Sequence, residues 1–505
     1  MTQNSLRPRR AGVATFMLAT LAGAGAVLAC PTPLDSDARN NRVPQQSLLA
    51  PRAAPSVAVD GAPEVQIPMR SPETATPCEG GFAGPYPCLN VDLAAVLPMS
   101  DIGGGEGNDI WGWTDPQSGT EYAIMGRTNG TAFIDVSDPE APRYLGNLPT
   151  QTSSSLWRDV KVYDNHAYIV AEASGHGMQV FDLTQLRELT GPPITFLSTT
   201  LYTDFGAAHN IVINEDSGFA YAVGTRNSDD GCAGGLHMID ISTPDEPQFA
   251  GCYSGDGYTH DAQCIMYDGP DPDYNSGNRE ICFNYNEDTL TIVDVTNKSA
   301  PVMISRTGYF GSDYTHQGWV TDDHRFLLMD DEGDERDFGH NTKTYIWNIE
   351  NLDNPTVIGT YLARTAAIDH NLYIRGNFAY QANYRAGIRI LDLEDIANGN
   401  LSETGFFDIY PSNDAANFNG SWSIYPFFES GVVVASNIEQ GLLVIRPETL
   451  ALPFTVATAD SELGVCGDGD ATTQVDVGAG PDFEGQVSLS VAGAPPGLGK
   501  LRHEA

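Results

Sequence analysis

Short apolar runs, each ending in an acidic or polar residue, recur along the chain between about residues 90 and 450. Seven copies align on that last residue, and these marker residues lie 47, 58, 54, 54, 44 and 54 residues apart. The copies are Ala132–Asp135, Gln179–Asp182, His237–Asp240, Thr291–Asp294, Tyr345–Asn348, Arg389–Asp392 and Leu443–Arg446. Four of them are followed closely by a proline, which indicates a tight turn into another strand.

Two more strand-like segments precede each marker, as 209–213 and 219–223 precede Asp240. Each unit therefore holds about four short strands in about 50 residues, which is typical of a propeller blade. The seventh unit lacks its last strand, and a lone strand-like segment, 91–97, lies before the first unit. We predict an all-β fold: a seven-bladed β-propeller over residues 78–450, closed by this N-terminal strand.

The regions outside the repeats have a different composition. Arg7, Arg9 and Arg10 precede an apolar run that ends at Cys30, so residues 1–30 are predicted to be a lipoprotein-type signal peptide with Cys30 lipidated. Ordinary cleavage after an Ala-x-Ala site is the alternative. Residues 31–77 are predicted to be a disordered linker, and residues 451–505 a partial Ig-like, β-sandwich-like tail or a disordered one.

The formal net charge of -40 changes the set of expected partners. Such a surface repels nucleic acid and anionic membrane, so we expect no nucleic-acid partner and membrane contact only through a lipid anchor. An unknown protein or polysaccharide at the cell surface is the expected partner. The predicted location is outside the cell, either secreted or as an outer-membrane or cell-surface lipoprotein.

The cysteines fit an exported protein. Eight are present, and none forms a CxxC pair that would indicate zinc. Their spacing predicts three disulfides, Cys78–Cys88, Cys232–Cys252 and Cys264–Cys282, with Cys466 left over.

The strand Leu290–Asp294 resembles the LVIVD repeat. Four longer motifs are Cys78–Cys88, Tyr258–Cys264, Tyr314–Trp319 and Ile368–Tyr373. They resemble the choice-of-anchor B family, whose members are secreted bacterial proteins with an LVIVD-type propeller. The resemblance covers about residues 78–450. It implies the fold and an extracellular location, and it implies no reaction.

The strongest candidate chemistry is a set of histidines at one register of four consecutive inner strands: His209, His260, His316 and His370. A polar residue follows each of them, namely Asn210, Asp261, Gln317 and Asn371, and two other blades carry Asp109 and Asp159 near the same position. Because inner strands surround the central channel, one register forms one ring, which predicts a site for iron, copper or zinc with these polar neighbours behind it. The alternative is that the histidines only hydrogen-bond blade to blade.

Two other groups are weaker candidates. The acidic residues Asp330, Asp331, Glu332 and Asp334, and the loop start Asp271, Asp273 and Asn275, offer hard oxygens for structural calcium, although solvated acidic loops explain them as well. Trp111, Trp113, Trp157, Trp319 and Trp422 lie on inner-strand segments, where they either stack on sugars or pack between blades.

No HExxH, Gly-x-Ser-x-Gly or P-loop motif is present. Two hypotheses therefore stand. The first is a surface-anchored propeller that acts as a binding or scaffold module. The alternative is a metal-dependent enzyme with its centre at the four-histidine ring on the axis.

Overall fold

The structure is a computed structural model that describes residues 75–226, 230–450, 454–458 and 475–479. The predicted signal peptide, Cys30, the linker up to residue 74, Cys466 and most of the tail lie outside the described residues. The chain divides into two compact units, and one of them contains all seven blades. The other contributes one described pair of antiparallel strands, β32 (Phe454–Thr458) and β33 (Val475–Ala479).

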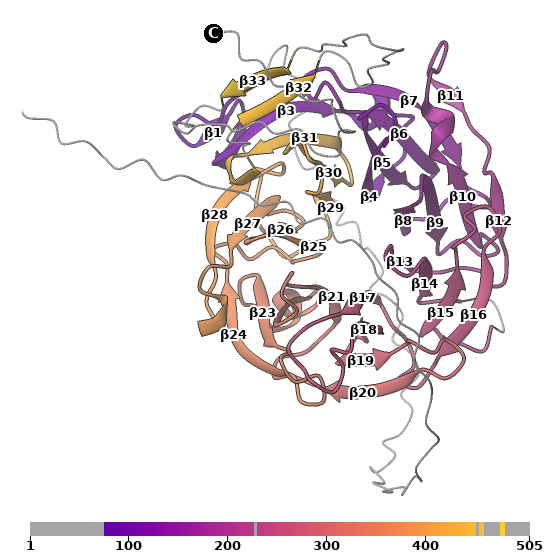
Figure 1. Cartoon of the computed structure of the whole chain (residues 1–505). Helices are drawn as coiled ribbons and strands as arrows, with labels where there is room; N and C mark the ends of the chain where they lie inside the picture. The colour runs from indigo at the N-terminus through magenta and orange to yellow at the C-terminus, as the bar shows by residue number, and fades with distance from the viewer. Residues whose placement is uncertain (1–74, 227–229, 451–453, 459–474, 480–505) are drawn as a thin grey trace, which may run out of the picture. The chain divides into compact units, whose positions relative to one another are not determined.

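Seven sheets surround a central channel (Figure 1), which confirms the predicted propeller. Blades 1 to 3 consist of β4 (Gly107–Thr114), β5 (Glu121–Arg127), β6 (Gly130–Asp135) and β7 (Arg143–Pro149); β8 (Arg158–Tyr163), β9 (His166–Ala171), β10 (Met178–Asp182) and β12 (Thr200–Tyr202); and β13 (Asn210–Asn214), β14 (Phe219–Val223), β15 (Leu236–Asp240) and β16 (Gln248–Tyr253). Blades 4 and 5 consist of β17 (Asp261–Tyr267), β18 (Arg279–Tyr285), β19 (Leu290–Asp294) and β20 (Val302–Thr307); and β21 (Thr315–Val320), β22 (Phe326–Asp331), β23 (Lys343–Asn348) and β24 (Thr356–Leu362). Blades 6 and 7 consist of β25 (Leu372–Arg375), β26 (Phe378–Ala382), β27 (Ile388–Asp392) and β28 (Ser402–Phe407); and β29 (Ser421–Tyr425), β30 (Val433–Asn437), β31 (Gly441–Pro447) and β3 (Val91–Leu97).

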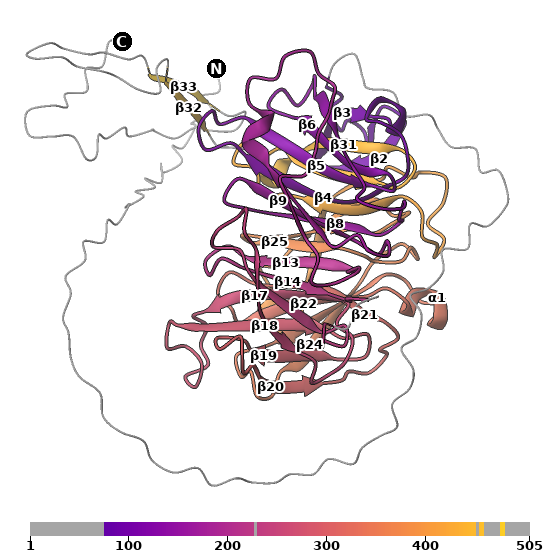
Figure 2. The ribbon, with the colours of Figure 1, turned by 90° about the vertical axis from the view of Figure 1, so that its right-hand side faces the viewer.

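Helices in the described part of the chain are short. They are α1 (Asp334–Phe338), η1 (Met99–Asp101), η2 (Leu183–Leu186), η3 (Ile396–Asn398) and η4 (Glu448–Leu450). Seen from the side, α1 lies at one face of the propeller (Figure 2). None of the helices that the structure describes has the length and apolar character needed to cross a membrane.

The marker residue of the repeat has a local structural reason. In six blades it ends the third strand, and its side-chain oxygen accepts the backbone N–H of the second residue after it, as Asp240 does from Ser242 at 2.9 Å and Asp392 does from Glu394 at 2.7 Å. This hydrogen bond turns the chain toward the fourth strand. The apolar residues just before the marker are buried between neighbouring blades, as Ile239 and Leu391 are.

The ring closes as predicted. Strand β3 pairs antiparallel with β31, from Val91 opposite Pro447 to Leu97 opposite Leu442, so a segment from the N-terminal side completes the last blade. Neighbouring inner strands contact each other all the way round, from β4 through β29 and back to β4. Closure leaves no long inner edge free for pairing with another chain.

Two sheet extensions were not predicted. A hairpin of β1 (Phe82–Ala83) and β2 (Tyr86–Leu89) adds to β28 and widens blade 6 to six strands. Strand β11 (Ile194–Thr195) leaves blade 2 and pairs in parallel with β7 of blade 1. This excursion occupies the long spacing between the second and third markers.

The three predicted disulfides are present. Cys264 and Cys282 are directly opposite each other on β17 and β18. Cys88 lies on β2, which extends blade 6, whereas the backbone N–H of Cys78 donates to Asp92 on the closing strand β3. The Cys78–Cys88 bond therefore links the outer parts of the last two blades.

Candidate metal centre

The structure brings the four predicted histidines together at one end of the central channel. His209 and His260 immediately precede β13 and β17, His370 lies two residues before β25, and His316 is the second residue of β21. Successive ring centroids are 4.2, 4.3 and 4.4 Å apart. All four side chains are buried. The sequence repeat, which aligns equivalent positions of successive blades, was therefore sufficient to predict that these four histidines lie together.

Each imidazole uses its Nδ1 on an acceptor. His260 Nδ1 lies 3.0 Å from the His316 carbonyl oxygen, and His370 Nδ1 lies 2.5 Å from that of Trp422. A carbonyl only accepts, so both Nδ1 atoms carry the proton and both Nε2 atoms carry the lone pair.

The other two rings have carboxylate partners. His209 Nδ1 is 2.7 Å from Glu172 Oε1, and His316 Nδ1 is 2.9 Å from Asp330 Oδ1. Metal-binding histidines typically show this arrangement, in which an acceptor fixes one ring nitrogen and leaves the other to the ion.

Glu332 adds an oxygen to the same place. Its carboxylate lies 3.9 Å from His316 Nε2 and 3.6 Å from His370 Nε2, and it accepts the hydroxyl of Tyr384 at 2.6 Å. The donor atoms of His260, His316 and Glu332 all lie within 4.8 Å of one another. A cavity of about 30 Å³ lies among these groups, which is the room of a single water or ion. Its remaining walls are Trp157, Tyr314, Tyr384, Phe418 and Trp422.

Burial favours the neutral form of three of these imidazoles, His260, His316 and His370. Loss of solvation lowers the pKa of His260 and His316 well below its ordinary value and lowers the pKa of His370 to about 4. Burial also raises the pKa of Glu332 to about 7. Neutral imidazole is the form that coordinates transition metals.

The polar residues that follow the histidines were predicted to support them, but they hydrogen-bond to the backbone of neighbouring blades instead. Asn210 donates to the His260 carbonyl, Asn371 donates to the Trp422 carbonyl, and Gln317 exchanges two hydrogen bonds with the backbone of Leu372. These residues connect neighbouring blades, and the Nδ1 hydrogen bonds of His260 to the His316 carbonyl and of His370 to the Trp422 carbonyl do so as well. Successive side chains on a strand point to opposite sides, which is why the polar residues do not line the cavity of the histidines.

The predicted aspartates also lie apart from the histidine rings. Asp109 and Asp159 both bind the Lys161 ammonium, at 3.0 and 2.6 Å, and Asp261 lines a second cavity. Among the hydrogen bonds and ion pairs of the described residues, these carboxylates contact Lys161 and backbone N–H groups and not a histidine ring.

The acidic stretch of blade 5 is not a solvated loop, contrary to the explanation preferred from sequence. Asp330, Asp331, Glu332 and Asp334 are buried, and they diverge. Asp331 accepts the backbone N–H groups of Asp313 and Tyr314, while Asp334 accepts the Lys343 ammonium. The four carboxylates therefore serve separate partners, which does not favour one shared calcium ion.

In the second candidate calcium site, the residue expected as the first ligand, Asp271, already accepts hydrogen bonds from the protein backbone. Asp271 is buried, and its two oxygens accept the backbone N–H groups of Asp273 and Leu352. Asp273 and Asn275 are exposed. The Asp271 carboxylate holds the β17–β18 loop against blade 5.

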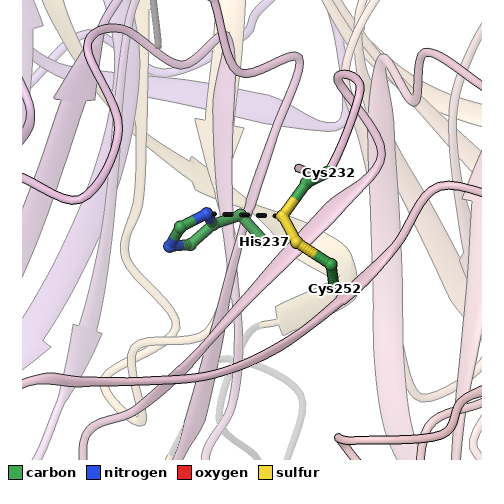
Figure 3. A group of neighbouring side chains, drawn as sticks. All are labelled: Cys232, His237 and Cys252. Carbon is green, nitrogen blue, oxygen red and sulfur yellow. Dashed lines mark hydrogen bonds between the residues drawn. A yellow bond between two sulfur atoms is a disulfide. The ribbon is translucent and has the colours of Figure 1, made fainter. Parts of the chain in front are cut away.

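A third cluster combines sulfur and nitrogen donors. Cys232, His237 and Cys252 lie together, and His237 Nδ1 is 3.5 Å from Cys232 Sγ (Figure 3). The two sulfurs are bonded to each other, so they do not act as thiolate ligands.

Sequence reasoning missed Glu172 and the role of Asp330 and Glu332. Asp330 is on β22, Glu332 follows that strand by one residue, and Glu172 directly follows β9, so all three belong to the second strand of a blade or its end. The prediction rests on the inner strands alone. In an antiparallel blade, the end of the second strand lies beside the start of the inner strand. Acidic residues at the ends of the second strands were therefore the signal in the sequence that could have found these residues.

Comparison with known proteins supports the repeat class. The model of the LVIVD repeat family matches residues 284–307, which cover the end of the second strand and the whole of the third and fourth strands of blade 4. No curated protein matches the chain. The fold and the repeat together define a seven-bladed β-propeller that carries an LVIVD repeat.

Solved propeller structures show only remote similarity. The chain is similar to the β-propeller domain of Myceliophteria thermophila Cps50 (Swd1), at 11% identity over 65% of this chain and 93% of that one, with a TM-score of 0.42. It is also similar to Kuenenia stuttgartiensis hydrazine synthase, at 12% identity over 67% and 94% of the two chains, with a TM-score of 0.45. These values carry no argument about function.

Proposed function

We propose that the start of the channel binds a transition-metal ion and that the chain is a metal-dependent enzyme. The observation that carries the proposal is the shared geometry of the four rings: each Nδ1 is held by its own acceptor, and the rings meet around one ion-sized cavity. Packing histidines need no such common arrangement.

The donor set indicates which ions suit the site. The His260 and His316 imidazoles and the Glu332 carboxylate have donor atoms within 4.8 Å of one another, and His209 and His370 line the same cavity. Imidazole ligands together with a carboxylate suit iron, copper or zinc. A bound ion with a free position would act as a Lewis acid, while Glu332 and Tyr384, linked at 2.6 Å, would hold a proton beside it.

Location and partners belong to the same proposal. The three disulfides fit an exported protein in an oxidising compartment, and anchoring through Cys30 would place the propeller at the cell surface. A role as a surface binding or scaffold module is the second candidate. It is favoured by a second, larger cavity in the channel, of about 420 Å³.

Metal analysis of the untagged full chain tests the proposal. We expect about one iron, copper or zinc ion per chain, and we expect His260→Ala with His316→Ala to lose it. His166→Ala is the matched control. Its ring contacts Asp164 on blade 2 and Asp245 in a neighbouring loop of blade 3, and it is not among the residues that line the histidine cavity.

Thermal unfolding of the same variants separates metal loss from misfolding. A folded double variant without metal, beside a control that keeps it, supports the proposal. A metal-free, fully folded wild type that takes up none of the three ions would contradict it and leave the binding or scaffold role.

A further inference from the structure

A second cavity lies further along the same inner strands. The histidine centre uses residues at their starts, such as His209 and His260, whereas this cavity of about 420 Å³ uses later ones, such as Ile213 and Ile265. It is large enough for a small organic molecule. Nothing in the proposed metal chemistry uses it.

One wall of this cavity is aromatic. Trp111, Trp319, Tyr373, Tyr425 and Phe427 line it from blades 1, 5, 6 and 7. Trp111 contacts Tyr425 and Tyr373 edge-on at 5.1 and 5.6 Å between centroids, and four of the five rings are only partly buried. Partly buried rings keep π surface available to a ligand.

This wall already holds one ammonium group of the protein itself. Lys161 Nζ lies 4.7 Å from the centroid of the Trp111 ring. Asp109 and Asp159 neutralise that ammonium at 3.0 and 2.6 Å, so Lys161 has its own counter-ions. The wall is therefore of a kind that stabilises a cation.

The lining also carries several acidic groups. Lys161 is the only basic residue in the lining, which also contains Asp261, Glu215 and Asp216. Asp261 accepts the backbone N–H of Ala262 at 2.7 Å. These three acids outnumber the one ammonium of the lining, which is already paired with Asp109 and Asp159, so a ligand cation would add positive charge beside them.

We propose that the cavity binds a small organic cation of the quaternary-ammonium class, seated against the aromatic wall around Trp111 with Asp261 as its counter-ion. This site is independent of the metal centre. A neutral sugar, which aromatic walls also bind, is the competing ligand.

Calorimetric titration of the full chain with choline tests this, with 3,3-dimethyl-1-butanol as the neutral probe of the same shape and cellobiose as the sugar. We expect saturable binding of choline and at least about tenfold weaker binding of the neutral probe, because only the cation gains from ring faces and carboxylate. Asp261→Asn keeps the size and the acceptor for Ala262 and should weaken choline about tenfold. Asp268→Asn, an exposed acid outside the cavity, is the control and should change nothing.

The wild-type comparison decides the matter even if a substitution prevents folding. Equal affinity for choline and the neutral probe, binding of cellobiose in place of choline, or no binding of choline at all would overturn the proposal. So would choline binding that Asp261→Asn leaves unchanged.

Discussion

The starts of the inner strands serve two purposes in one ring. In blades 3 to 6 this register carries a histidine that faces the ion-sized cavity, whereas blades 1, 2 and 7 carry Asn108, Arg158 and Gly420 there. Arg158 is buried and donates to the Arg127 carbonyl, the Thr150 hydroxyl and the His176 ring. Asn108 donates to the Leu156 carbonyl. The comparison shows that one repeated position supplies the side chains of the candidate site in some blades and hydrogen bonds that stabilise the fold in others.

The largest expected effect on stability comes from removing the buried hydrogen bonds of Arg158. Arg158→Ala leaves its acceptors unpaired in a buried place and should reduce the free energy of unfolding by about 3–5 kcal/mol. The control is Arg143→Ala, whose exposed side chain meets only Asp135 and should cost less than about 1 kcal/mol. Denaturant unfolding measures both. If the two variants lost the same free energy of unfolding, the buried hydrogen bonds of Arg158 would not be what stabilises this part of the ring.

The partner of Arg158 predicts a pH effect of about the same size. Burial lowers the pKa of His176 to about 4, and the nearby Arg158 guanidinium acts in the same direction. The unfolded chain then takes up this proton first, so the stability present above about pH 6.5 is lost as pH falls toward 4.

Replacing this ring should flatten that loss. His176→Gln is expected to remove up to about 3 kcal/mol of the decline between pH 6.5 and 4, measured by denaturant unfolding at each pH. His166→Gln, on a half-buried ring of the same blade, provides the control. An unchanged pH profile for His176→Gln would mean that this histidine does not titrate as described.

On the site-building side, the expected effect is on the metal. Glu172→Met removes the acceptor of His209 Nδ1 and should weaken metal binding about 10–100-fold. Glu140→Met, on an exposed residue paired with Arg446, should leave affinity unchanged. Competition with a chelator gives the affinities. No difference between the two variants would remove Glu172 from the centre.

The smallest effect is expected at the register position of blade 7. Gly420 has φ +95°, and a Cβ there would meet the Tyr384 carbonyl oxygen at 2.4 Å. Gly420→Ala should therefore cost about 1–3 kcal/mol more than Gly119→Ala, where φ is +72° and space is open. Matching unfolding midpoints for the two variants would contradict this reading.

The fold was predictable because its signal is repeated. A marker such as Asp240 turns the chain by a local hydrogen bond, and this happens in six blades, so sequence spacing alone reveals the blades. The closing strand was predictable from a missing strand at the other end. The β1–β2 hairpin was not, because it occurs once and its pairing with β28 joins Cys88 to Phe407 across more than half of the chain.

The site was half predictable for the same reason. The four histidines follow the repeat, whereas Glu172 and Asp330 come from second strands of two different blades and follow no common spacing. Glu332 appeared as one acid among several, and only the fold shows that it turns to His316 and His370 while Asp334 turns to Lys343. Neighbouring acids on a strand and its following turn point in different directions, which composition does not reveal.

Anomalous diffraction from crystals of the metal-loaded full chain, collected at the absorption edge of the bound metal, tests the account most directly. It predicts one peak in the cavity that the four histidines line, about 2.0–2.3 Å from a ring nitrogen of His260, a ring nitrogen of His316 and a carboxylate oxygen of Glu332. A metal peak elsewhere, with these four rings packed against each other and no ion between them, would contradict it.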